Sequence, residues 1–156
     1  MEKQKIQNGI RTAFWPGRFE CILENPLFYI DGAHNTDAAE KLKQSLVQTV
    51  PDQKRIGIMG VMADKPCREM TAVLNPLFEH IYTVTPDNTR ALPAEKLAEE
   101  IRRQGGRASA ADSVHSAVRQ AYEEAMEEGQ GSMITAFGSL YFLREVKRAL
   151  HEITGD

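Results

Sequence analysis

The stretch Asp31-Gly-Ala-His-Asn35 places an acid, an imidazole and an amide between an apolar run and an amphipathic segment. A turn at this point needs the Gly and the Asn, but it does not need the acid and the imidazole. The first N–H groups of a helix are unpaired and carry partial positive charge, so they attract phosphate. A carboxylate repels phosphate but accepts hydrogen bonds from the two hydroxyls of a ribose. The stretch therefore suits a nucleotide. Asp31 would bind the sugar, and the start of the helix, where His34 and Asn35 lie, would bind the phosphates.

A simpler interpretation stays open for the same five residues, in which Asp31 caps a turn and His34 is an exposed loop residue. The distribution of polar side chains bears on this choice. Ligands of open α/β sheets bind outside the carboxyl ends of the strands. The strand-to-helix loops are rich in polar and charged residues, namely Asp31, His34, Asn35, Asp64, Lys65, Asp87, Asn88, Arg90 and Ser139, whereas the helix-to-strand loops are ordinary turns. This asymmetry predicts one functional edge.

Several motifs of nucleotide and hydrolytic chemistry are absent. The sequence has no G-x-G-x-x-G, no G-x-x-x-x-G-K-[ST] and no G-x-S-x-G, which excludes the usual dinucleotide site, triphosphate loop and nucleophile elbow. No cluster of His, Cys, Asp and Glu has the spacing of a metal site. We therefore assign no catalytic residue and no metal ligand.

Short apolar runs alternate with amphipathic segments along the chain. Residues 19–24 and 27–31 are predicted as a β-hairpin, with Asn25 and Pro26 at its turn. Further strands are expected at 55–61, 80–85, 107–110 and 132–138, and helices at 36–50, 66–78, 93–104, 112–128 and 139–151. This alternation predicts an α/β fold: a mostly parallel twisted sheet with helices on both faces, a Rossmann-like three-layer domain with an added hairpin strand.

Composition narrows the class of protein. The chain has 156 residues, 42% of them hydrophobic, and a formal charge of −3, so no basic footprint for nucleic acid is present. No apolar run approaches the ~20 residues that span a bilayer, and the N-terminus lacks a secretory signal. The two cysteines, Cys21 and Cys67, lie far apart and form no metal or disulfide pattern. We expect a cytoplasmic protein without membrane or nucleic-acid partners.

Residues 1–18 differ from the remainder and are predicted as an interdomain linker, with a single domain at 19–156. Phe14 and Trp15 form a bulky apolar pair before a Pro-Gly turn. They either pack on the edge of this domain or meet another domain, because exposed aromatic pairs usually have a partner.

Four segments, WPGRFE, YIDGAHN, GVMADKP and TAFGSLYFLREV, occur in this order and spacing. Together they resemble the C-terminal domain of folylpolyglutamate synthase/dihydrofolate synthase, of the Mur ligase superfamily, over about residues 6 to 150. The resemblance implies an ATP-dependent ligase that adds glutamate to dihydropteroate or folates through an acyl phosphate. It also implies a missing N-terminal domain, which would hold the phosphate loop and the Mg²⁺ ligands.

The resemblance also implies roles for individual residues. Asp31 would bind the ribose of ATP, and His34 and Arg18 would reach its phosphates, with Asn35 at the same helix end. Lys65, Ser139 and Tyr141 would lie in the cleft or near the glutamate. Thr36 stands where the family usually has Pro, which affects only the rigidity of the helix start.

The resemblance predicts a domain that closes over the nucleotide and is inactive alone, and the Met1 start just before the linker suggests a fragment. Two alternatives remain: the C-terminal domain of another Mur-type amino-acid ligase, or a non-catalytic module that binds an anion or nucleotide. The WPGR and DGAHN segments argue against a cell-wall ligase.

Overall fold

The computed structural model describes residues 18–51, 53–128 and 131–155, so the predicted linker lies outside it except for Arg18. The strands are β2 (Glu20–Glu24), β3 (Leu27–Asp31), β4 (Lys54–Met59), β5 (His80–Thr83), β6 (Ala108–Ala110) and β7 (Ser132–Phe137). The helices are α1 (Thr36–Thr49), α2 (Cys67–Leu74), α3 (Ala94–Arg103), α4 (Val114–Glu128) and α5 (Leu140–Thr154), with a 3₁₀ turn, η1 (Asn75–Leu77), after α2.

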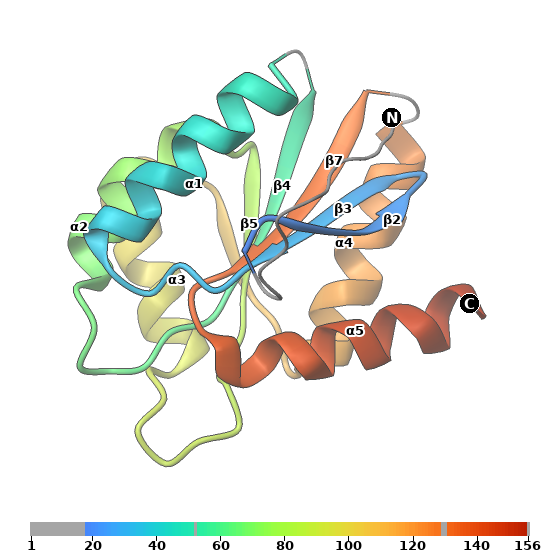
Figure 1. Cartoon of the computed structure of the whole chain (residues 1–156). Helices are drawn as coiled ribbons and strands as arrows, with labels where there is room; N and C mark the ends of the chain where they lie inside the picture. Colours follow the sequence, from blue (N-terminus) through green and yellow to red (C-terminus); the bar gives the residue numbers. More distant parts are fainter. Residues whose placement is uncertain (1–17, 52, 129–130, 156) are drawn as a thin grey trace.

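Six strands form one twisted sheet in the order β2-β3-β7-β4-β5-β6 (Figure 1). The pairs from β3 to β6 are all parallel, and β2 is antiparallel to β3 at the edge. The predicted parallel sheet with a hairpin strand is therefore confirmed. The alternation of short apolar runs with amphipathic helices dictates this result, because parallel neighbours need a crossover between them.

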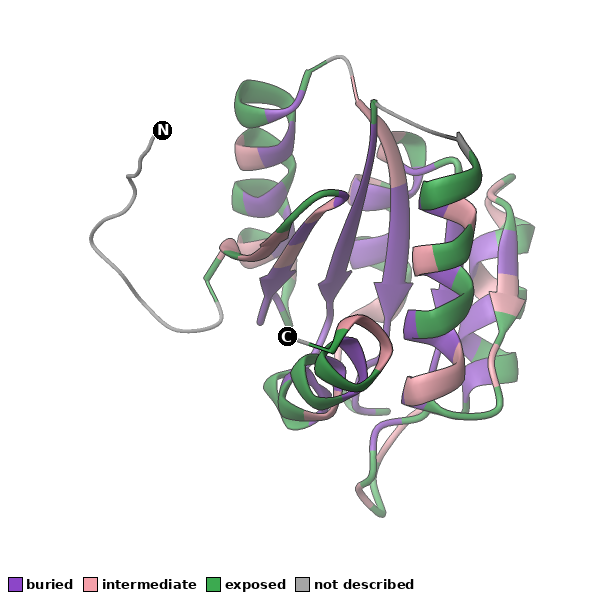
Figure 2. Ribbon diagram, turned by 90° about the vertical axis from the view of Figure 1, so that its right-hand side faces the viewer, coloured by how far each residue is buried: buried purple, intermediate pink, exposed green. Residues whose placement is uncertain are grey.

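Helices cover both faces of the sheet. Apolar residues of α1, α2 and α3 pack with one set of inward strand residues, and those of α4 and α5 pack with the other set. Figure 2 shows the consequence, with buried strands in the middle layer and helices that are buried on their inner sides and exposed outside. Strand β7 is buried along its whole length, as expected for a central parallel strand. Among the described residues, no helix has both the length and the apolarity that crossing a membrane requires.

The predicted helix at 66–78 is wrong in its last turn. The α-helix ends at Leu74, and Asn75–Leu77 form a 3₁₀ turn closed by a bond from the Phe78 N–H to the Asn75 carbonyl. Pro76 causes the change, because it has no N–H to continue the ladder of an α-helix.

The parallel register aligns the carboxyl ends of five strands. Asp31 pairs with Phe137, Phe137 with Met59, and Met59 with Thr83, which pairs with Ala110. The loops that follow these residues therefore leave the sheet from one row.

Two of these loops approach so closely that one of them needs a glycine at the point of contact. Gly138, directly after β7, has a φ of +116°, and a Cβ at this position would lie 2.3 Å from the carbonyl oxygen of Gly60. The Gly60 N–H in turn donates to the Phe137 carbonyl at 3.2 Å. The backbones after β7 and β4 are thus locked together beside the row of strand ends.

Gly138→Ala is expected to lower the free energy of unfolding by about 3 kcal/mol, because it adds a backbone clash to an unfavourable positive φ. Gly105 is the matched control, since it has a φ of +91° but a Cβ added to it would have no atom within 4 Å. Gly105→Ala is expected to cost about 1 kcal/mol in the same urea unfolding experiment. Equal losses for the two variants would contradict the close approach.

Candidate functional site

The site residues predicted from the sequence lie where neighbouring strands are followed by helices on opposite faces of the sheet. This happens twice, between β3 and β7 and between β7 and β4. Strand β3 leads into α1 on one face, its neighbour β7 leads into α5 on the opposite face, and β4 leads back to α2 on the first. Ligands of open α/β sheets bind at such switch points. Asp31 pairs with Phe137, so the loop that holds His34 and Asn35 and the turn that holds Ser139 follow adjacent strand ends, while Tyr141 lies in the first turn of α5. Lys65 lies farther along the loop after β4.

Asp31 ends β3 as a buried carboxylate, 8% exposed. Its Oδ1 accepts a hydrogen bond from the Ala33 N–H at 2.8 Å, and its Oδ2 accepts one from the Phe19 N–H at 2.9 Å. Burial raises the pKa of Asp31 to about 6, against the two backbone donors and the nearby Arg18, which lower it. Each carboxylate oxygen has a second lone pair, so Asp31 can still accept bonds from ligand hydroxyls.

His34 is exposed, and its Nδ1 lies 2.9 Å from the Gly32 carbonyl oxygen. A carbonyl only accepts, so Nδ1 must bear the proton, and the neutral ring then has a bare Nε2. His34 can donate from Nε2 to a phosphate only as the imidazolium. The turn therefore fixes the tautomer of the side chain that was predicted to meet the phosphates.

Asn35 is the N-cap of α1. Its Oδ1 accepts from the Ala38 N–H at 2.8 Å and its carbonyl oxygen accepts from the Ala39 N–H at 3.0 Å. Helix geometry leaves the N–H groups of Thr36 and Asp37 without an intrahelical acceptor. The exposed Asp37 carboxylate lies in this first turn and weakens the attraction of the helix end for an anion.

The remaining predicted residues occupy different positions around this edge. Arg18 is exposed and its charge acts on the Asp31 carboxylate. Ser139 is buried and caps α5, its hydroxyl oxygen accepting from the Tyr141 N–H at 3.1 Å. Tyr141 is 59% exposed, and Lys65 is partly buried. The described residues include no group of three or more His, Cys, Asp or Glu that could hold a metal ion.

Phe19 is a site neighbour that the sequence analysis missed. Its ring stacks on Tyr29 with 4.2 Å between centroids and 7° between planes, and its N–H reaches Asp31. Phe19 was predicted as the first residue of a strand, whereas β2 begins at Glu20 and Phe19 has a φ of 48°. Its contact across twelve positions was not predictable, because nothing in the spacing distinguishes Phe19 from an ordinary strand residue.

His80 lies at the opposite end of the strands and is not part of this edge. It is buried, with Nδ1 2.9 Å from Glu124 Oε1 and Nε2 2.8 Å from Ser109 Oγ, and the Tyr82 hydroxyl also donates to Glu124 Oε1 at 2.6 Å. This network ties α4 to β5 and β6. It explains why a histidine occupies a buried strand start.

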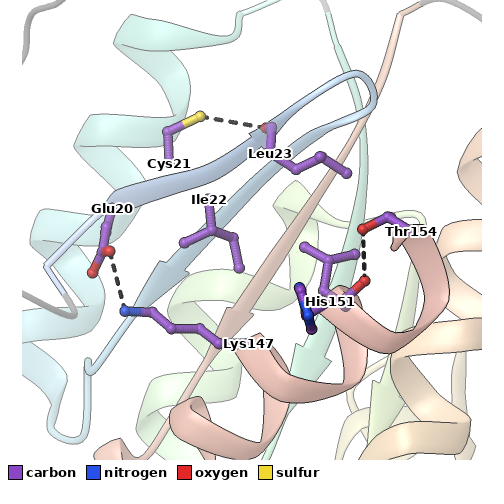
Figure 3. A pocket seen from close by; sticks show the side chains of 8 residues that line it. Glu20, Cys21, Ile22, Leu23, Lys147, His151 and Thr154 are labelled. Carbon is purple, nitrogen blue, oxygen red and sulfur yellow. Dashed lines mark hydrogen bonds and ion pairs between the residues drawn. The ribbon is translucent and has the colours of Figure 1, made fainter. Parts of the chain in front are cut away.

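A groove with a volume of about 340 Å³ lies between β2 and the C-terminal half of α5 (Figure 3). Its lining includes the ion pair between Lys147 Nζ and Glu20 Oε2, at 3.2 Å, with Cys21 and His151. None of the predicted site residues lines it. The groove is therefore separate from the edge that the sequence indicates.

The fold is a doubly wound α/β domain, and the candidate ligand edge lies at a central switch point of its sheet. Residues 17–140 match the family described as Mur ligase, glutamate ligase domain, and the chain belongs to this family. The resemblance seen in the sequence is thereby confirmed.

Three relatives illustrate the match. The dihydrofolate synthase/folylpolyglutamate synthase of Bacillus subtilis is 28% identical over 149 residues, which cover 94% of this chain and 33% of the relative. The structure of the bifunctional folylpolyglutamate synthase/dihydrofolate synthase of Yersinia pestis, complexed with AMPPNP and a Mn ion, superposes with a TM-score of 0.79 at 31% identity, covering 89% of this chain and 32% of that one. A bifunctional synthase structure with Mn, AMPPNP and L-glutamate bound gives a TM-score of 0.72 at 29% identity, covering 90% and 33%. The chain thus spans about a third of the length of these relatives.

The raised pKa of Asp31 predicts a pH-dependent stability. The folded state holds this proton more tightly than the unfolded state, so the resulting stability is full below about pH 4 and is lost as pH rises through about 6. Relative to Asp31→Asn, which cannot titrate, the wild-type free energy of unfolding should fall by about 2 kcal/mol between pH 4 and pH 7. Urea unfolding of both proteins across this range measures the difference, and a difference independent of pH would show that Asp31 is not perturbed.

Proposed function

We propose that this chain is the nucleotide-contacting domain of an ATP-dependent ligase that adds L-glutamate to dihydropteroate or folates through an acyl phosphate. The observation that supports this most directly is the family match over residues 17–140, together with the position of Asp31–Asn35 at the switch point of the sheet. The relatives crystallised with AMPPNP, and in one case with L-glutamate, support the choice of ligands.

In this proposal Asp31 binds the ribose hydroxyls with the lone pairs that the two backbone donors leave. His34, as the imidazolium, and Arg18 bind the phosphates at the start of α1, and the Asn35 cap holds that helix end in place. Ser139, Tyr141 and Lys65 line the adjoining cleft for the glutamate. The phosphate loop, the Mg²⁺ ligands and the folate site would belong to the part of the ligase that this chain does not include.

The proposed chemistry gives such a domain two tasks. An acyl phosphate hydrolyses in water, so a ligase gains when a second domain closes over the intermediate and excludes solvent. Phosphoryl transfer is promoted mainly by positioning and by cationic groups near the phosphates. Arg18 and His34 supply charge and Asp31 supplies orientation, and no general base from this chain is needed. We propose the same cytoplasmic setting for the whole ligase.

Titration of the chain with Mg-ATP, followed by the backbone amide signals in NMR, tests the nucleotide site. Shifts should cluster at residues 31–37 and 60–65, and Asp31→Ala should weaken binding roughly tenfold or more, as expected for a lost bond to a charged group. The control Asp87→Ala removes an exposed acid from the loop after β5 and should bind like wild type. If millimolar Mg-ATP moves none of these amides, the proposed half-site is wrong.

The chain alone is expected to show no glutamate ligation, because it contains no G-x-x-x-x-G-K-[ST] loop to hold a triphosphate and half a cleft does not exclude water. Incubation with Mg-ATP, radiolabelled glutamate and dihydropteroate or tetrahydrofolate measures this directly. Product formation by the purified chain would contradict the division of labour proposed here.

A further inference from the structure

The first described residues enter the domain in an unusual backbone conformation. Phe19 has a φ of 48° and is the only non-glycine residue with positive φ among those the structure describes. A bulky side chain avoids this region, and such a residue persists only where its surroundings fix it. The contacts of Phe19 show what holds it there and what depends on it.

Three contacts fix this entry segment, which we define as residues 18–20. The Phe19 ring stacks on Tyr29, the Phe19 N–H donates to Asp31 Oδ2 at 2.9 Å, and Glu20 Oε2 pairs with Lys147 Nζ at 3.2 Å. Figure 3 shows the last of these, where Glu20 at the start of β2 meets Lys147 on α5. The segment is thus attached to β3 and to α5.

The Asp31 carboxylate joins the entry segment to the candidate site. Its Oδ2 is bonded to Phe19, while its Oδ1 is bonded to the Ala33 N–H in the loop that leads to α1. With only 8% of the residue exposed, the direction of the free lone pairs is set by these two donors. A displacement of Phe19 must therefore change the orientation of the carboxylate, its solvation, or both.

We infer that Phe19 is a positioning residue for the nucleotide site, because it orients the Asp31 carboxylate and couples the entry segment to whatever that carboxylate binds. This inference rests on the proposed function, which gives Asp31 the ribose. The coupling works in both directions, since a ligand that favours one position of the entry segment is itself bound more tightly when the segment holds that position.

Paired variants separate the stacking ring from the backbone. Phe19→Gly tolerates the positive φ and removes the ring together with the restriction that a side chain places on the backbone, whereas Phe19→Tyr keeps both. Tyr29→Leu removes the aromatic partner without changing the sequence of the entry segment, and Tyr29→Phe is its control. Both ring-deleting variants are expected to weaken Mg-ATP binding about fivefold, the equivalent of one neutral hydrogen bond, and both conservative variants should bind like wild type.

Two amide signals give a readout that a purely structural role would not move. In the free chain, the amides of Phe19 and Ala33 should titrate together with Asp31, with a midpoint near pH 6, and Asp31→Asn should abolish the step in both. Mg-ATP should shift the Phe19 amide along with those of residues 31–37. Arg18 is the charged residue that acts on the same carboxylate, so Arg18→Gln should move the midpoint upward without removing it.

The outcomes distinguish this inference from the proposed function. If Asp31→Asn loses nucleotide binding while Phe19→Gly binds like wild type, the positioning role is wrong and the ribose assignment stands. If wild type does not respond to Mg-ATP, or Asp31→Asn binds it unchanged, the ribose assignment fails and the inference built on it fails too. A Phe19 amide that ignores the titration of Asp31 overturns the coupling irrespective of nucleotide.

Discussion

The close contact between the turns after β7 and β4 is the constraint on which the candidate site depends. Gly138 adopts a conformation that other residues rarely reach and lies against the Gly60 carbonyl. The two turns are therefore held next to each other at the carboxyl ends of β7 and β4. Strand β7 pairs with β3 on its other side, which brings the end of β3 into the same row. Loops from three adjacent strands therefore start from fixed, aligned points.

Burial of Asp31 is the energetic cost that this arrangement tolerates. A carboxylate at the end of a buried strand loses solvation, and two backbone N–H donors and Arg18 only partly offset the loss, so its pKa rises to about 6. If the only role of this side chain were to stabilise the turn, a buried acid would not be needed, because Asn or Ser could accept a similar bond from the Ala33 N–H without the cost of burying a charge. Perturbed groups of this kind cluster at functional sites, which favours a ligand over a cap as the reason for the acid.

The periodicity of apolar residues predicted the alternating strands and helices. A short apolar run is typical of a buried strand, and apolar residues at helical spacing are typical of a helix with one buried face. The caps Asn35 and Ser139 were also predictable, since both precede an amphipathic segment. The break after Leu74 was missed because a helical stripe continues to Phe78, although Pro76 was visible. The contact of Phe19 with Asp31 was beyond prediction, because it depends on the antiparallel register of β2 with β3, which the sequence leaves open. The network around His80 was missed for the same reason, since Glu124 and Ser109 are distant in the chain.

Two helices on opposite faces of the sheet begin at this edge, α1 after β3 and α5 after β7, and in each the cap side chain accepts from one N–H of the first turn. The partial positive charge of each helix end remains, but the exposed Asp37 opposes it at α1. Helix dipoles alone thus give this edge little hold on an anion. In the proposed site the exposed side chains of Arg18 and His34 supply the charge for phosphate, and His34 can donate from Nε2 only as the imidazolium, because its Nδ1–H is bonded to the Gly32 carbonyl.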